Sequence, residues 1–196
     1  EALSKQPTYV DALINKGSVL VKLGEPVRAI EVLSEAVKLA PDNPLARTNL
    51  ATALRHVGEL ESARKQINSA IELNPNYPEA HGTLGEILMA GGDFSSALEA
   101  YDTALTQRPG FMAVRLNQAA TLYKSGQLEE ASDVYNSVLT DFKDSADAYA
   151  GLGTVHLQRA VRGRARHHRD GDRHQRAVHR RCDHPVGRAL RGSVVH

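Results

Sequence analysis

The pattern that decides the fold is contained in residues 44–77, PLARTNLATALRHVGELESARKQINSAIELNPNY. Its first half predicts a helix over residues 45–57, because Leu50 and Leu54 are spaced i, i+4 and share one face. Gly58 predicts the end of that helix, since glycine adopts the left-handed backbone conformation that closes helices.

The second half of the stretch predicts another helix over residues 60–73. Apolar residues on its inner face recur at helical spacing, at Ala63, Ile67, Ala70 and Ile71. Pro75 blocks continuation, because proline lacks the backbone N–H and clashes with the preceding turn. The stretch therefore predicts a helical hairpin, with a first helix A and a second helix B.

This hairpin pattern repeats every 34 residues along the chain. The recurring positions are prolines at 7, 41, 75 and 109, glycines at 24, 58, 92 and 126, alanines at 29, 63, 97 and 131 and again at 2, 36, 70 and 104, and small residues at 17, 51, 85, 119 and 153. Small residues let the two helix axes approach to the short end of the range of about 8–10 Å. A single hairpin cannot bury its own face, so we expect neighbouring hairpins to stack.

A period of 34 residues built from two helices resembles the tetratricopeptide repeat family, over residues 1 to about 160. The resemblance implies an all-α fold, a right-handed superhelical solenoid of antiparallel helix pairs. The sequence departs from the family at the large aromatic residue near the start of helix A. The residues at that position are Leu13, Arg47, His81 and Arg115, and only Tyr149 fits.

The register divides the chain into units. We expect residues 1–9 to be the end of a truncated upstream repeat, residues 146–160 to be helix A of a partial fifth repeat, and four complete repeats to lie between them, at 10–43, 44–77, 78–111 and 112–145. Residues 161–196 lie outside the pattern, and their frequent glycines predict an irregular tail.

Composition separates the tail from the repeats. Residues 1–160 contain 14 Lys and Arg against 20 Asp and Glu, a net charge of −6, whereas residues 161–196 contain 10 Arg against 3 Asp, a net charge of +7. The single cysteine excludes an internal disulfide. No apolar run approaches the roughly 18 residues that span a bilayer, so we expect no membrane partner.

Three interpretations of the tail remain open. It could be an arginine-rich arm for nucleic acid, although no aromatic residue interleaves the arginines to stack on bases. It could hold a metal at His179, Cys182 and His184, although this spacing fits no established zinc pattern. We favour a third hypothesis, a change of reading frame near Arg159. The tail lacks Lys, Glu, Ile, Phe and Tyr, and a frame shifted by one nucleotide permits a helix-forming string at 161–175.

The candidate binding residues lie on the A helices, which line the concave surface in the family that the repeats resemble. Positions two, five, six, nine, twelve and thirteen of each unit are expected to face inward. The sixth position holds Asn15, Asn49, Thr83, Asn117 and Gly151, a row similar to the asparagine ladder in the repeat domains of O-linked N-acetylglucosamine transferases. An Asn side chain has both donors and an acceptor, so it can pair with an extended peptide backbone. The other expected groove residues are Ser18, Lys22, Thr52, Arg55, His56, Glu86, Tyr123 and Lys124.

These residues predict a protein-interaction scaffold that binds an extended peptide. A non-catalytic portion of a larger enzyme, such as a glycosyltransferase, is the second hypothesis, and nucleic-acid binding through the tail is the third. We expect no enzyme activity, cofactor or metal, because residues 1–160 contain no phosphate-binding loop, nucleophile motif or metal-ligand set. Self-association through the open partial repeat is a further expectation.

Overall fold

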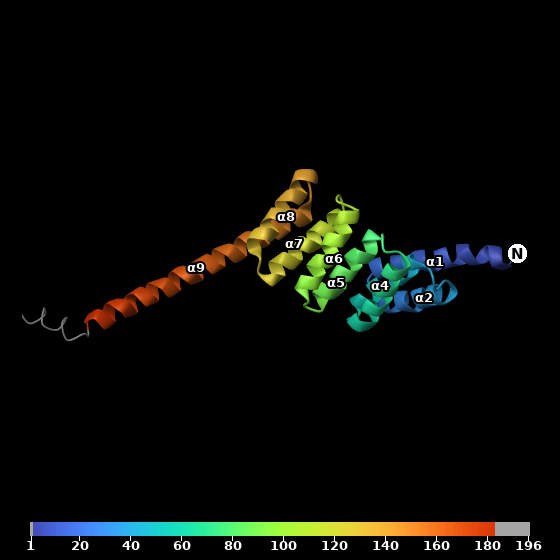
Figure 1. The fold of residues 1–196 in the computed structure, drawn as a ribbon, viewed down its shortest axis with the longest axis horizontal. Helices are drawn as coiled ribbons and strands as arrows, with labels where there is room; N and C mark the ends of the chain where they lie inside the picture. Colours follow the sequence, from blue (N-terminus) through green and yellow to red (C-terminus); the bar gives the residue numbers. More distant parts are fainter. Residues whose placement is uncertain (1, 183–196) are drawn as a thin grey trace, which may run out of the picture. The chain divides into compact units, whose positions relative to one another are not determined.

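The computed structural model describes the backbone of residues 2–182 and the side chains of residues 8–164. Over that range the chain is helical and contains no strand, which confirms the predicted all-α fold (Figure 1). The helices are α1 Ala2–Lys22, α2 Pro26–Leu39, α3 Pro44–His56, α4 Leu60–Leu73, α5 Pro78–Ala90, α6 Phe94–Gln107, α7 Met112–Ser125, α8 Leu128–Asp141 and α9 Ala146–Cys182. Residues 1–152 form one compact unit and residues 153–196 a second, and α9 spans the boundary.

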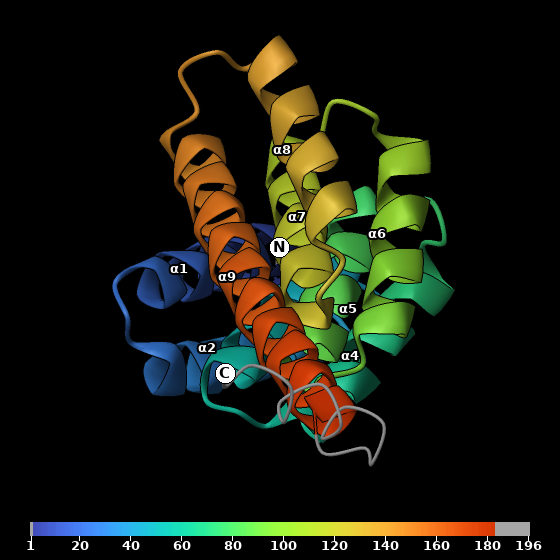
Figure 2. The same cartoon turned by 90° about the vertical axis from the view of Figure 1, so that its left-hand side faces the viewer.

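Successive helices pair as hairpins (Figures 1 and 2). Helix α1 packs on α2, α3 on α4, α5 on α6 and α7 on α8, and each hairpin also contacts the next one in the chain. The predicted helices at 45–57 and 60–73 correspond to α3 and α4, with a difference of one residue at each end of α3. These pairs form the solenoid that the repeat predicts.

Glycine and proline set the ends of the helices. Gly58 has φ +82°, and the N–H of Glu59 donates to the carbonyl of Leu54 across this turn at 3.0 Å. Gly24, Gly92 and Gly126 adopt the same left-handed conformation. Each turn leads into a B helix, and Pro44 and Pro78 occupy the first turns of the next A helices, where their missing N–H is not needed.

The core follows the predicted apolar positions. Leu50, Leu54, Ala63, Ile67 and Ala70 are all buried. They belong to one hydrophobic cluster that extends from Leu20 to Ile87, with further clusters on either side. The core is therefore a row of contacts between neighbouring hairpins.

Polar side chains replace the aromatic residue that the family carries near the start of helix A. Arg47 Nε donates to the carbonyl of Pro41 at 2.8 Å, and His81 Nε2 lies 2.9 Å from the carbonyl of Pro75. Both bonds reach back six residues to the loop that precedes the helix. In α3 and α5 the departure from the family thus has a structural role, because Arg47 and His81 tie the A helix to its preceding loop.

The start of the chain differs from the prediction. We expected residues 1–9 to end a helix B at Pro7, but α1 is one continuous helix through Pro7. Pro41, Pro75 and Pro109 are each followed within three residues by another proline or a glycine, whereas Thr8, Tyr9 and Val10 follow Pro7. No second helix-breaking residue follows Pro7, so the helix continues through this position to Lys22.

The C-terminal tail also differs from the prediction. We expected irregular structure from residue 161, but α9 continues as a helix to Cys182. Position 160 is the next in the register of the turn glycines, and it holds alanine, the strongest helix former. Without a glycine there the chain does not turn into a helix B. Residues 183–196, which include His184 of the metal hypothesis, lie outside the described residues.

Candidate peptide-binding surface

The A helices of the four hairpins form one layer, because α1 contacts α3, α3 contacts α5 and α5 contacts α7. Gly82 of α5 allows a close approach to α7, since a Cβ at this position would lie 2.9 Å from Cγ2 of Val114. We define the A-helix face as the predicted inward-facing residues of this layer: Asn15, Ser18, Lys22, Asn49, Thr52, Arg55, His56, Thr83, Glu86, Asn117, Tyr123 and Lys124.

No residue of the A-helix face is fully buried, so each keeps some contact with solvent. The exposed members are Asn15, Lys22, His56 and Lys124. The half-buried members are Ser18, Asn49, Thr52, Arg55, Thr83, Glu86, Asn117 and Tyr123. Half-buried polar groups are suited to recognition, because packing fixes their positions while the polar ends remain accessible.

Three of these side chains form a polar network across α3, α5 and α7. Asn117 Nδ2 donates to Glu86 Oε1 at 2.8 Å, and Arg55 Nη2 pairs with Glu86 Oε2 at 3.0 Å. The residues occupy the twelfth, ninth and sixth positions of successive units. The sequence predicted each of them for this surface, and the structure brings them into direct contact.

The electrostatics of the network extend to two further residues. His56 Nε2 lies 3.3 Å from Arg55 Nη2, and burial together with the Arg55 charge lowers the pKa of His56, against the opposing effect of Glu86. Burial, and then the Glu86 charge, raises the pKa of Tyr101 well above its usual value. The Tyr101 phenol therefore stays neutral, so the formal charges of the network are those of Arg55 and Glu86.

The asparagine row is not uniform. Asn117 uses its amide nitrogen for Glu86. Within the described residues no hydrogen bond engages the Asn49 side chain, so both its donors and its acceptor are available. Gly151 has a different role, because the Tyr135 ring occupies the space that a Cβ there would need. The prediction that the row reads a peptide backbone remains a prediction.

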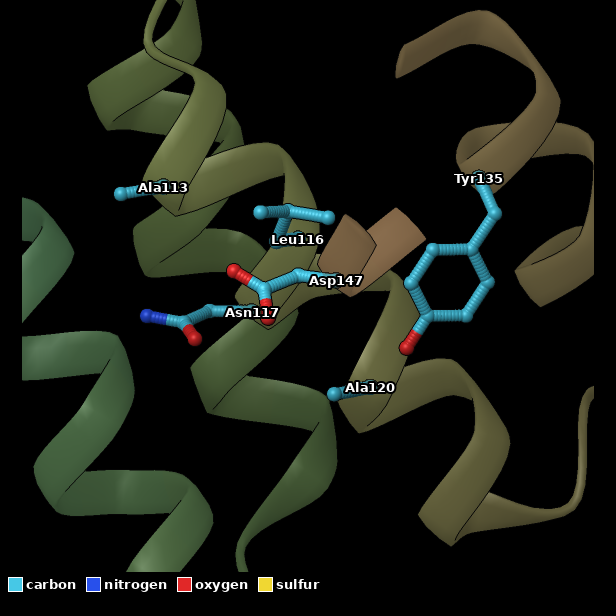
Figure 3. Close-up of a pocket in the computed structure, with 6 residues that line it drawn as sticks. All are labelled: Ala113, Leu116, Asn117, Ala120, Tyr135 and Asp147. Atoms are coloured by element: carbon cyan, nitrogen blue, oxygen red, sulfur yellow. The ribbon is translucent and has the colours of Figure 1, made fainter. Parts of the chain in front are cut away.

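A pocket of about 340 Å³ lies beside Asn117 (Figure 3). Ala113, Leu116, Asn117 and Ala120 line it from α7, Tyr135 from α8 and Asp147 from α9. The α7 residues hold positions two, five, six and nine of their unit, and Asp147 holds position two of the next. All five therefore lie at positions that the repeat register predicts to face inward. Figure 3 shows the Tyr135 hydroxyl directed toward the space between α7 and Asp147.

Sequence reasoning missed most of this pocket. It selected only Asn117 of the six lining residues, although the rule for inward positions also covers Ala113, Leu116, Ala120 and Asp147. Tyr135 belongs to helix B, where the register gives no reason to expect a residue on this surface.

The structure also bears on other kinds of site. In the part of the chain that it describes, no three His, Cys, Asp or Glu residues are grouped closely enough to hold a metal ion. No helix among the described residues combines the length and apolar character needed to cross a membrane.

Comparison with known families identifies the repeat. A family model described as tetratricopeptide repeat matches residues 20–87 and again residues 88–155. The chain belongs to this family. Each match covers about two successive units of the tetratricopeptide repeat array described above. No curated protein sequence matches the chain.

Solved structures of other proteins resemble this tetratricopeptide repeat chain. A crystal structure of MamA is 27% identical, with a TM-score of 0.60, and the match covers 74% of this chain and 85% of MamA. A thermophilic tetratricopeptide repeat protein of Thermus thermophilus, TTC0263, is 23% identical with a TM-score of 0.71, covering 80% and 86%. An O-GlcNAc transferase mutant from Thermobaculum terrenum is 19% identical with a TM-score of 0.66, covering 70% of this chain and 27% of the transferase. The last two similarities show the fold alone.

Proposed function

We propose that this protein is an interaction scaffold that binds an extended peptide along the A-helix face. The family and its structural neighbours support a protein-interaction scaffold in general. The observation that supports peptide binding is the Arg55–Glu86–Asn117 network, which fixes polar groups from three successive helices before any ligand arrives. A preorganised surface loses little conformational entropy on binding.

The A-helix face offers a peptide both kinds of hydrogen-bonding group. Asn49 can donate to and accept from a peptide backbone, and the oxygen of Asn117 remains as an acceptor. Side chains that pair with the backbone tolerate many peptide sequences. The tetratricopeptide fold is generally non-catalytic, and we propose that this chain binds without catalysing a reaction.

The test is affinity for pools of random, fluorescein-labelled twelve-residue peptides, measured by anisotropy with the full chain. We expect Asn49→Ala to weaken binding by about 0.5–1.5 kcal/mol, the usual net value of one hydrogen bond. Asn136→Ala is the matched control, because Asn136 is an exposed asparagine on helix α8. Equal losses in both variants, or no binding by the unmodified protein, would refute the proposal.

The other two hypotheses make different predictions. The similarity to an O-GlcNAc transferase shows the fold alone, so a role as part of a larger enzyme stays a hypothesis. Nucleic-acid binding would depend steeply on salt, because it releases counterions from phosphates. Peptide binding through the hydrogen bonds of the asparagine side chains would depend on salt much less steeply.

A further inference from the structure

We infer that the pocket beside Asn117 selects a basic side chain, lysine or arginine, of the bound peptide. This inference rests on the proposed peptide binding and adds a specificity to it. The pocket is lined by Asn117, Tyr135 and Asp147 together with Ala113, Leu116 and Ala120.

The polar groups of the pocket are mainly hydrogen-bond acceptors. A carboxylate only accepts, so the contact with Glu86 requires the Nδ2 of Asn117 and leaves the Asn117 oxygen for the pocket. The Asp147 carboxylate is a second acceptor. Among the described residues no hydrogen bond or ion pair engages the side chain of Asp147. Lysine presents three N–H donors and arginine five, and neither presents an acceptor.

No cation already fills this role in the described part of the chain. Arg115 lies on the same helix as Asn117, but its guanidinium donates to Asp141 at 2.5 Å and to Ser137 at 2.9 Å on α8. Arg55 is paired with Glu86. Lys124 is two turns further along α7 and does not line the pocket. The Asp147 charge is therefore available to a cation from outside.

The walls of the pocket suit the rest of a basic side chain. Lysine and arginine bury their methylene stems along apolar surface while the charged end remains in a polar environment. Leu116 and the two alanines provide that surface, and the Tyr135 ring offers an aromatic wall for a guanidinium. A volume of about 340 Å³ is at the lower end of the range for ligand pockets, which suits one side chain rather than a larger molecule.

The sequence explains why the pocket occurs in this unit. Positions two and nine of this unit are Ala113 and Ala120, whereas the two preceding units carry Leu45 and Thr52, then Glu79 and Glu86. The small side chains leave a hollow. Gly151 completes it, because its missing Cβ gives room to the Tyr135 ring from α8.

The experiment uses the full chain and four pools of random twelve-residue peptides that share a fixed central residue: lysine, arginine, glutamine or glutamate. We expect the lysine and arginine pools to bind about fivefold more tightly than the glutamine pool, the effect of one partly exposed charge pair. The glutamate pool should bind most weakly. Asp147→Asn should remove the preference and leave the affinity for the glutamine pool unchanged.

Asp144→Asn is the matched control, because it removes the same charge from an exposed loop residue that does not line the pocket. It should keep the preference for basic residues, and circular dichroism should show that both variants are folded. If all pools bind equally, or if the preference survives in Asp147→Asn, the pocket does not select a basic side chain and the scaffold proposal stands. If no pool binds the unmodified protein, both proposals fail.

Discussion

The ring of Tyr101 on α6 fills the space left by the missing side chain of Gly85 on α5. A Cβ at Gly85 would lie closer than 3.0 Å to three atoms of that ring. Tyr101 is fully buried, so the ring has no open side into which it could move. The contact sets how closely the two helices of this hairpin approach.

We therefore expect Gly85→Ala to destabilise the protein by about 1–3 kcal/mol, the usual cost of overpacking a core. Gly153→Ala is the matched control, because Gly153 holds the same register position and has no atom within 4 Å of its Cβ position. That variant should gain about 0.5–1 kcal/mol, as alanine is favoured over glycine within a helix. Thermal unfolding measures both, and equal melting temperatures would contradict the packing argument.

The turn between α5 and α6 offers a second matched pair. Gly92 has φ +83°, a conformation that costs an alanine about 1 kcal/mol or more, whereas the neighbouring Gly91 has an ordinary helical φ of −78°. Gly92→Ala should lower the denaturation midpoint in urea, and Gly91→Ala should leave it unchanged or raise it slightly. A Cβ at Gly91 meets its neighbours only at ordinary contact distances. If Gly91→Ala is less stable than Gly92→Ala, the backbone conformation of these glycines does not determine the stability of the turn.

The network on the A-helix face predicts a pH effect. Burial and Arg55 lower the pKa of His56, while Glu86 raises it, so Glu86→Gln should lower this pKa further. The pKa of His56 is lower in the folded protein than in the unfolded chain, so as the pH falls the unfolded chain is protonated before the folded protein. His56 should therefore make the protein less stable as the pH falls through about 6.5, the usual pKa of histidine. Titration of the ring by NMR measures the pKa directly.

Glu79→Gln is the control for the pH effect. It removes a carboxylate from the same helix, α5, but the Glu79 carboxylate pairs with Arg108 rather than with Arg55. We expect it to leave the pKa of His56 unchanged. A pKa of His56 that is the same in the unmodified protein and in Glu86→Gln would show that the carboxylate does not act on the histidine.

Removal of residues 161–196 tests the hypotheses for the tail. If a change of reading frame produced this segment, the shortened protein should unfold at the same temperature and neither form should bind nucleic acid at low salt. A melting temperature lowered by several degrees, or salt-sensitive binding that the deletion removes, would show that the tail has a role. The salt dependence matters because phosphate contacts weaken steeply as salt rises.

Self-association through the incomplete fifth unit remains a prediction. Tyr149, Leu157 and Val161 are large apolar residues that are more than half exposed on α9. We expect sedimentation to show a concentration-dependent increase in mass, and Leu157→Lys to reduce it. Val27→Lys is the control, because Val27 is similarly exposed on α2. If sedimentation shows a monomer at every concentration, the prediction of self-association is wrong.

The sequence predicted those features that depend on a single unit. The turn at Gly58, the paired helices and the buried positions of α3 and α4 all follow from local spacing, and the structure confirms them. Arg55, Glu86 and Asn117 were each expected on one surface, but their hydrogen bonds join three units. A pattern read one unit at a time could not predict that contact.

The pocket was missed for a related reason. Tyr101 and Tyr135 share a register position, yet one ring lies against Gly85 of its own hairpin and the other against Gly151 of the following helix. The unit of Tyr135 carries Ala119 at the register position of Gly85. Such choices depend on the space between elements, which periodicity does not describe.

The contact pattern of the A helices has a consequence for how the protein tolerates change. Each of the helices α1 to α8 contacts only helices one or two places away in the chain, and no contact among these eight helices joins the first to the last. Stability in such a chain is close to a sum of local terms and nearest-neighbour terms. Substitutions in α2 and in α8 should therefore act independently. A lineage could alter the pocket beside Asn117 without disturbing the opposite end, which lets specificity and stability evolve separately.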